Sequence, residues 1–206
     1  MRKKLMMVVI LASVCGLPTY STSAEWVQLF NGTDMTGWQH VGEGSFVVED
    51  GALKGIEGMG LLWYTRQTFG NCVIRVVYKG ENDDSNSGLY IRIPERPTEP
   101  MMPVRRGHEI QIAGDHTGEL FGFTKATIER SKPEGGWNLL EVTIDGPRTV
   151  VKLNRVLVTD YTEGSSKPFI DWVGDVVRPN EGYIGVQNHE PTSVYFREIA
   201  VKPLEK

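Results

Sequence analysis

Alternation of apolar and polar residues with a period of two runs through almost every patterned segment of this chain. In residues 88–93, for example, leucine and isoleucine alternate with Tyr90 and Arg92. Successive side chains of a β-strand point to opposite faces of its sheet, so such a segment is predicted to be a strand with one core face. The predicted strands span residues 45–49, 52–55, 71–78, 88–93, 108–112, 139–144, 149–153, 156–161, 182–189 and 194–201.

Clusters of Gly, Pro, Asn and Asp separate these segments, as in Glu49-Asp-Gly51, Asp145-Gly-Pro147 and Asn154-Arg155. These residue types favour tight turns. Many short strands with turn signals at roughly 8–12-residue intervals are typical of a sandwich or jelly roll. No amphipathic run of helical length interrupts the pattern, apart from a turn predicted near residues 169–176. We therefore predict an all-β fold, an antiparallel two-sheet β-sandwich.

Two connecting segments, residues 94–103 and 113–133, are too long and irregular to be simple hairpin turns. Loops of this length in a compact domain are usually functional or disordered. The aromatic and histidine content of these two favours ordered loops that form part of a site. Proline stiffens the first loop, which suits a fixed wall more than a moving lid.

The N-terminal residues 1–24 are predicted to be a secretion signal. Three basic residues follow Met1, an apolar run spans residues 5–17, and a small-residue cleavage pattern ends at Ala24. This order is that of a signal peptide, and the run is too short to span a bilayer comfortably. Val14 precedes Cys15, which argues against lipoprotein processing. We expect a secreted or periplasmic protein without an integral membrane segment in the mature chain.

The remaining residues, 25–206, have the size of a single domain with room for a full core. The whole chain carries a formal net charge of −4, and loss of the three basic residues of the signal takes it to −7. This charge disfavours nucleic acid or an anionic membrane as a partner. Cys72 is then the single remaining cysteine, so no intramolecular disulfide can form, and its apolar strand predicts a buried core residue.

Three predicted strands each direct a pair of polar side chains away from the core. The pairs are Tyr90 with Arg92, Glu109 with Gln111, and Gln187 with His189, whereas His108 falls on the core side. If these strands are neighbours, the six side chains cover one concave sheet face. Aromatic rings, amides, Arg and carboxylates are the groups that bind sugars. Solvated outer faces are the default for an antiparallel sandwich, but Lys, Thr, Ser and Glu are more usual there. The pattern thus favours a functional cleft.

Several chemistries are excluded by what the sequence lacks. There is no Gly-x-Ser-x-Gly elbow, no His-Glu-x-x-His helix and no cysteine-based zinc pattern. The carboxylate pair of a retaining laminarinase-type jelly roll is also missing, because the comparable strand reads Glu109-Ile-Gln111. Ordinary retaining glycoside hydrolysis needs two carboxylates across the sugar ring and is therefore disfavoured.

Six motifs in order resemble the 3-keto-disaccharide hydrolase domain, a family of secreted bacterial proteins with a concanavalin-like, laminarinase-type jelly roll. The resemblance covers essentially the whole mature chain. The motifs are Leu29-Phe-Asn-Gly-Thr-Asp-Met-Thr-Gly-Trp38, Asn86-Ser-Gly-Leu-Tyr-Ile-Arg92, His108-Glu-Ile-Gln-Ile112, Gly136-Trp-Asn138, Leu153-Asn154 with Asp160-Tyr161, and Gly185-Val-Gln-Asn-His189 with Val194-Tyr-Phe-Arg197.

The resemblance implies cleavage of glycosides that are oxidised at C3, a chemistry that fits a single carboxylate. A C3 ketone acidifies the C2 proton, so the glycosidic bond can break by elimination, with water added back later. That route needs a general base near C2 and a polarising group at the C3 oxygen. Our assignment makes Glu109 or His189 the base and Arg92 the enolate stabiliser. A divalent metal bound by His189 and Glu109 is an alternative for the second role.

The same resemblance gives roles to the other polar residues of the cleft. Asn86, Tyr90, Gln111 and Gln187 would orient sugar hydroxyls, with Trp137 or Tyr64 as a stacking wall. Two functions stay open: a secreted glycoside-cleaving enzyme acting on 3-keto-glycosides, and a non-catalytic, lectin-like carbohydrate-binding module. A structural role in the cell envelope has no positive support in the sequence.

Overall fold

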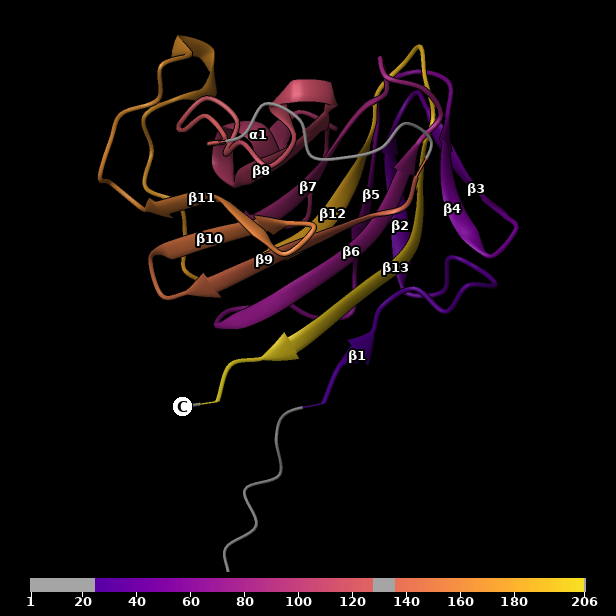
Figure 1. Ribbon diagram of the computed structural model, residues 1–206, viewed down its shortest axis with the longest axis horizontal. Coiled ribbons are helices and arrows are strands. Elements are labelled where there is room, and N and C mark those ends of the chain that lie inside the picture. Colours follow the sequence, from indigo (N-terminus) through magenta and orange to yellow (C-terminus); the bar gives the residue numbers. More distant parts are fainter. Residues whose placement is uncertain (1–24, 128–135, 206) are drawn as a thin grey trace, which may run out of the picture.

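The computed structural model describes residues 25–127 and 136–205 and confirms an all-β sandwich of two antiparallel sheets (Figure 1). Every predicted strand is present within a few residues of its expected bounds. The predicted signal peptide, residues 1–24, lies outside the described residues, as do residues 128–135, which include the end of the second long connector.

The larger sheet has the strand order β11-β10-β9-β6-β13-β4-β3, and β1 also pairs with β13. Alternating β-branched and polar residues form these strands, with the apolar members facing the other sheet. Its strands are β1 (Val27–Gln28), β3 (Ser45–Glu49), β4 (Ala52–Ile56), β6 (Cys72–Gly80), β9 (Asn138–Asp145), β10 (Arg148–Leu153), β11 (Val156–Thr162) and β13 (Val194–Pro203).

The smaller sheet has the order β2-β5-β12-β7-β8. Its strands are β2 (Trp38–Gly42), β5 (Gly60–Tyr64), β7 (Asn86–Ile93), β8 (His108–Ala113) and β12 (Tyr183–Asn188). The strands β2 and β5 are not among those predicted from the alternation pattern. All five residues of β5 are buried, so the strand reads as a short apolar run without the alternation of a half-exposed strand.

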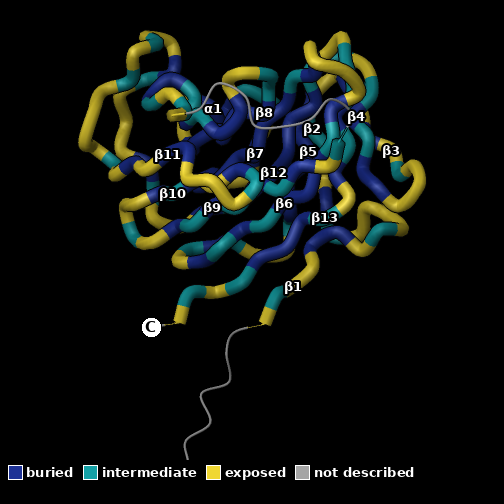
Figure 2. The backbone as a smooth tube through the Cα atoms, in the orientation of Figure 1, coloured by how far each residue is buried: buried dark blue, intermediate teal, exposed yellow. Residues whose placement is uncertain are grey.

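The core lies between the two sheets, where buried aliphatic side chains from alternate positions meet. Figure 2 shows burial running along the strands of both sheets, while the exposed residues gather in the loops. Cys72 is buried and free, as predicted, and burial raises the pKa of its thiol to about 12. Core residues of the smaller sheet include Leu89, Ile91, Ile110, Ile184 and Val186, and those of the larger sheet include Ile74, Val76, Leu140, Val142 and Phe196.

The proline-rich connector between β7 and β8 crosses the outer face of the smaller sheet. It leaves β7 after Ile93 and reaches Gly42, the last residue of edge strand β2. A Cβ on Gly42 would lie 3.2 Å from Cγ of Pro100. It ends in the short helix α1 (Met102–Arg106), which packs against β7 and β8. In the described part of the chain, no helix is long and apolar enough to cross a membrane. The proline-rich connector thus lies as a wall beside the outer face of the smaller sheet, and its rigidity stays a prediction.

Two further segments border the same face. After β8 the chain turns through the 3-10 helix η1 (Gly114–His116) and runs back along the edge of β8, with Phe121 N–H donating to the Glu109 carbonyl at 2.9 Å. A later segment contains the 3-10 helix η2 (Asp171–Val173), in the region where a turn was predicted. Phe169 N–H donates to the Gly122 carbonyl at 2.8 Å and joins the two segments.

Candidate functional site

The three strands that carry the predicted polar pairs are neighbours, in the order β12-β7-β8. On one side Gly88 is paired with Gln111 and Tyr90 with Glu109; on the other, Gly185 is paired with Tyr90. Directly opposed residues in an antiparallel pair point to the same face. The smaller sheet therefore presents one polar patch to the side away from the core, as predicted except for Arg92.

This patch is the floor of a hollow of about 190 Å³, called here the Glu109 pocket. Its volume is below the range of about 300–1,000 Å³ usual for drug-sized ligands, which suits a ligand as small as a single sugar ring. Its described lining is Met59, Asn86, Met101, Glu109, Gln111, Phe121, Trp172, Gln187 and His189. Five of the nine predicted site residues are thus brought together: Asn86, Glu109, Gln111, Gln187 and His189.

Glu109 lies across the centre of the floor, in the space left by a glycine. A Cβ on Gly88 would lie 2.3 Å from Glu109 Oε1 and 2.7 Å from its Cγ, so any larger residue at position 88 would displace the side chain. Glu109 is 4% exposed. Burial raises the pKa of its carboxyl group to about 8, because a charge removed from water without a compensating partner is costly. It is the only carboxylate among the described residues that line the pocket.

Gln187 presents an acceptor without a partner. Its Nε2 donates to the Tyr90 hydroxyl at 2.6 Å, and its backbone carbonyl accepts from Ser87 Oγ at 2.5 Å. Its side-chain Oε1 is buried and has no hydrogen-bond partner among the described atoms. An unpaired buried acceptor costs about 1–3 kcal/mol, and because this oxygen is closed to solvent, a ligand reaches it only if the side chain moves. Tyr90 itself is fully buried beneath the pocket, so it fixes Gln187 and does not line the site.

Gln111, Asn86 and His189 complete the polar lining. Gln111 Nε2 donates to Asn86 Oδ1 at 2.8 Å, which leaves the Asn86 amide N–H groups for a ligand. His189 is partly exposed at the rim, and its Nδ1 lies 2.7 Å from the Glu190 carbonyl oxygen. A carbonyl only accepts, so the proton of a neutral His189 is on Nδ1 and the lone pair on Nε2.

The aromatic wall of the pocket is formed by Phe121 and Trp172, which sequence analysis did not identify. Their ring centroids are 5.8 Å apart, and Trp172 is 50% exposed. Sugars stack on such exposed rings through their C–H faces. Both residues lie in irregular segments, where no periodicity assigns a direction to a side chain. The available signal was a tryptophan close to Phe169, Val176 and Val177 in a segment without periodicity.

The prediction for Arg92 is wrong in its placement. Arg92 has a φ of +55°, and the β12–β7 register shifts beside it between Tyr183 and Gly185. This bulge turns the side chain out of the alternation. Its guanidinium is buried and donates to backbone carbonyls, at 2.8 Å to Pro179 and 2.8 Å to Gly146. Arg92 therefore cannot polarise a ligand in the Glu109 pocket, and it fastens the segment after Trp172 to the larger sheet.

Neither residue proposed as the stacking wall lies at the pocket. Tyr64 points to the core side of β5, where its ring packs against Trp38 with centroids 5.3 Å apart. Trp137 precedes β9 of the larger sheet, 37% exposed, with the Arg197 guanidinium 4.4 Å from its ring centroid. Because β5 is buried on both faces, its sequence does not show to which face Tyr64 points. Residue 137 precedes its strand, so strand alternation did not place it.

His108 faces the core, as predicted, and belongs to a buried network behind the pocket. Its Nε2 lies 2.7 Å from Glu163 Oε2, and Glu163 Oε1 accepts from the backbone N–H of Arg178 at 3.0 Å. Burial lowers the pKa of His108, against the opposing effect of Glu163. Burial would raise the pKa of Glu163, but the hydrogen bonds from His108 and Arg178 outweigh it and leave that pKa lowered.

Glu109 and His189 alone do not form a complete set of metal ligands. The two residues line the same pocket, but no group of three or more His, Cys, Asp or Glu side chains in the described ranges is arranged to hold a metal ion. Catalytic zinc usually has three protein ligands. Glu109 and His189 supply only two, and the mechanism proposed below uses no metal.

Comparison with known proteins places the chain in a family. Residues 25–202 match the model of the 3-keto-alpha-glucoside-1,2-lyase-like domain. The chain belongs to this family. A search of curated proteins found no match.

Solved structures support the fold. Two proteins from Parabacteroides distasonis, provisionally described as glycosyl hydrolases, are 22% and 23% identical, with TM-scores of 0.71 and 0.72. The alignments cover 87% of this chain in both cases, and 100% and 94% of those chains. The carbohydrate-binding module CBM66 from Bacillus subtilis is 14% identical, with a TM-score of 0.55 over 81% of this chain and 95% of the module. At these identities the likeness shows a shared jelly-roll-like sandwich.

Proposed function

We propose that this protein is a lyase that cleaves 3-keto-glucosides by elimination, with Glu109 as the general base. The observation that carries the proposal is a single buried carboxylate on the floor of a sugar-sized pocket, its pKa raised to about 8. A retaining or inverting glycosidase uses two carboxylates, and the described lining supplies one. The family description, an alpha-glucoside 1,2-lyase-like domain, supports an elimination across C1 and C2.

In this mechanism Glu109 removes the proton from C2, which the neighbouring C3 ketone makes acidic. The electron pair of that C–H bond forms an enolate, with its charge on the C3 oxygen. The enolate then re-forms the ketone as a C1=C2 double bond forms and the bond from C1 to the leaving oxygen breaks. The leaving oxygen takes up one proton, so the products are an unsaturated 3-keto sugar and a free alcohol. Later hydration of the double bond gives the 3-keto sugar itself.

A strong base suits the first step, because base strength rises with the pKa of the conjugate acid. With a pKa of about 8, about one tenth of Glu109 is ionised at pH 7, and that fraction is far more basic than an ordinary glutamate. The activity should therefore rise with pH through the pKa of Glu109. Burial of Glu109 thus makes the base stronger and moves the pH at which the rate rises to about 8.

The remaining polar groups of the pocket then take distinct roles. The amide N–H groups of Asn86 and Gln111 replace Arg92 as the donors for the enolate oxygen. The Gln187 side chain, held by Tyr90 from below, forms part of the floor under the sugar, while Phe121 and Trp172 stack on the ring. His189, at the rim, acts in its protonated form: it donates the Nε2 proton to the leaving oxygen and is left as the neutral ring with its proton on Nδ1.

The test is incubation of the purified protein with methyl 3-keto-α-glucoside, with formation of the conjugated enone followed by ultraviolet absorbance. Wild-type protein should form the enone, and Glu109→Gln, which keeps the shape but not the base, should not. Binding of the substrate to the variant should stay within about tenfold of wild type, or 1.4 kcal/mol. Normal turnover by the variant would refute the role of Glu109.

A non-catalytic carbohydrate-binding module is the second candidate, favoured by the likeness to CBM66 and by the amide-lined pocket. It predicts that wild-type protein binds the 3-keto-glucoside and the parent glucoside but converts neither. Turnover by wild type excludes it. A secreted or periplasmic location is part of the proposal and is supported by the signal-like pattern of residues 1–24.

A further inference from the structure

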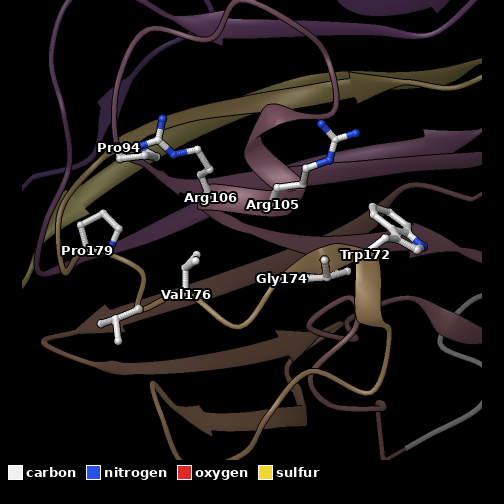
Figure 3. Close-up of a pocket in the computed structure, with 9 residues that line it drawn as sticks. Pro94, Arg105, Arg106, Trp172, Gly174, Val176 and Pro179 are labelled. Atoms are coloured by element: carbon white, nitrogen blue, oxygen red, sulfur yellow. The ribbon is translucent and has the colours of Figure 1, made fainter.

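A second, larger hollow adjoins the Glu109 pocket and shares Trp172 with it. Its volume is about 420 Å³, and it lies between helix α1 and the segment 172–179 (Figure 3). Trp172 stands at the side opposite Pro94 and Pro179, with Arg105 and Arg106 along the α1 side. We call it the arginine hollow. Because one tryptophan lines both hollows, a ligand held in the Glu109 pocket could extend past it into the arginine hollow.

The wall of this hollow formed by the segment 172–179 is apolar and unusually exposed. Val176 is half exposed and Val177 is 86% exposed, and both line the hollow with Pro179. Large aliphatic side chains gathered at a concave surface mark an interaction site more often than single exposed ones do. The flat indole of Trp172 continues this wall towards the Glu109 pocket, so the surface suits a planar, apolar group.

The opposite wall carries positive charge. Arg105 and Arg106 are both about half exposed, and no acidic side chain is among the described residues that line the hollow. Arg105 pairs with Glu99 at 2.8 Å and Arg106 pairs with Glu95, but both ion pairs are solvent-exposed and therefore weak. Arg105 and Arg106 are thus the positive groups that an anion in the hollow would meet, in competition with Glu99 and Glu95.

The two walls are tied together by a buried arginine. Arg178 donates to the Gly107 carbonyl at 3.0 Å and the Arg105 carbonyl at 3.3 Å, on the side of α1. It also donates to the Gly174 carbonyl at 3.0 Å and to the Val176 carbonyl at 2.5 Å. Hydrogen bonds from a charged donor are about twice as strong as neutral ones. The arginine hollow is therefore preformed and does not need a ligand to assemble it.

We infer that the arginine hollow is the subsite for the leaving group, and that it selects an aromatic aglycone carrying a carboxylate. This inference rests on the proposed function, because it needs the 3-keto ring to occupy the Glu109 pocket. The aromatic ring packs against Trp172 and the valines, and the carboxylate meets Arg105 and Arg106. Cleavage of the C1–O bond releases the aglycone as a hydroxybenzoate-type phenol, its oxygen having taken up the proton described above.

The test compares three 3-keto-α-glucosides, with methyl, phenyl and 4-carboxyphenyl aglycones. Wild type should show the lowest KM for the 4-carboxyphenyl substrate. The double variant Arg105→Gln/Arg106→Gln should raise that KM by up to about tenfold, the effect of two exposed ion pairs, and leave the methyl substrate within about twofold. The control Arg155→Gln/Arg197→Gln makes the same charge change at the outer face of the larger sheet and should alter none of the three.

Each failure has its own signature. If wild type turns over none of the three substrates, the proposed function fails, and calorimetric binding of the unoxidised methyl, phenyl and 4-carboxyphenyl glucosides still tests the hollow in the same variants. If methyl 3-keto-glucoside is cleaved but the 4-carboxyphenyl compound has no advantage over phenyl, the inference is overturned while the function stands. An equal loss for all three substrates in the Arg105/Arg106 variant also overturns it, because the arginines would then act on the reaction itself.

Discussion

Replacing Glu109 with Gln should change how the stability of the protein depends on pH. The folded protein raises the pKa of this carboxyl from its ordinary 4.5 to about 8, whereas the unfolded chain returns it to the ordinary value. Between these pH values the folded state holds a proton that the unfolded state has lost. The contribution of Glu109 to stability is therefore fully present below pH 4.5 and is lost as pH rises through about 8.

The size of this effect follows from the two pKa values. Each pKa unit corresponds to about 1.4 kcal/mol, so the gap sets a ceiling of about 5 kcal/mol on the loss. Gln resembles the protonated carboxyl in shape and does not titrate. At pH 5 the two proteins should unfold within about 1 kcal/mol of each other, and at pH 9 Glu109→Gln should be more stable by up to about 5 kcal/mol.

Urea unfolding of wild type and Glu109→Gln at pH 5, 7 and 9 measures the difference directly. Taking the difference cancels every other group that titrates in both proteins. Glu43→Gln, which removes an exposed carboxylate, is the matched control and should leave the pH dependence of wild type unchanged. A difference that stays flat from pH 5 to pH 9, or a variant less stable at pH 9, would refute the reasoning from burial.

Three further substitutions test separate parts of the site. Gly88→Ala places a methyl group where Glu109 lies, so turnover of methyl 3-keto-glucoside should fall at least tenfold and unfolding should cost about 1–3 kcal/mol less; unchanged kinetics would contradict the packing. Trp172→Ala should raise KM for that substrate severalfold, whereas Trp137→Ala, which removes a partly exposed tryptophan on the other sheet, should leave KM unchanged; equal effects would mean that Trp172 is no sugar platform. Arg178→Met leaves several carbonyls without a donor, and thermal and urea unfolding should show a loss of about 3–5 kcal/mol; a loss below 1 kcal/mol would contradict the role of the guanidinium.

Three strands of the smaller sheet, β7, β8 and β12, and most of the pocket floor could be predicted because each rests on regular alternation. Glu109 and Gln111 on β8, and Gln187 on β12, point where an extended chain directs them. Arg92 fails the same rule because a left-handed residue at a bulge breaks the alternation. Local sequence gives no sign of that bulge, which depends on how β7 meets β12.

The aromatic residues were harder to place, for two different reasons. The β5 strand is buried on both faces, so nothing in its sequence separates Tyr64, in the core, from Trp63, on the outer side. Trp172 lies in an irregular segment whose position is set by the distant buried arginines at positions 92 and 178. Its role depends on tertiary contacts that a periodicity argument does not contain.

The central claim is that the C2 proton is removed during cleavage, and deuterium at C2 tests it most directly. Methyl 3-keto-α-glucoside labelled at C2 should react with a primary isotope effect well above unity, and the label should pass from the sugar to the solvent. Unlabelled substrate that reacts in heavy water should give a hydrated product with deuterium at C2. Cleavage at the same rate for both isotopes, with the C2 label fully retained in the product, would contradict elimination and the assignment of Glu109 as its base.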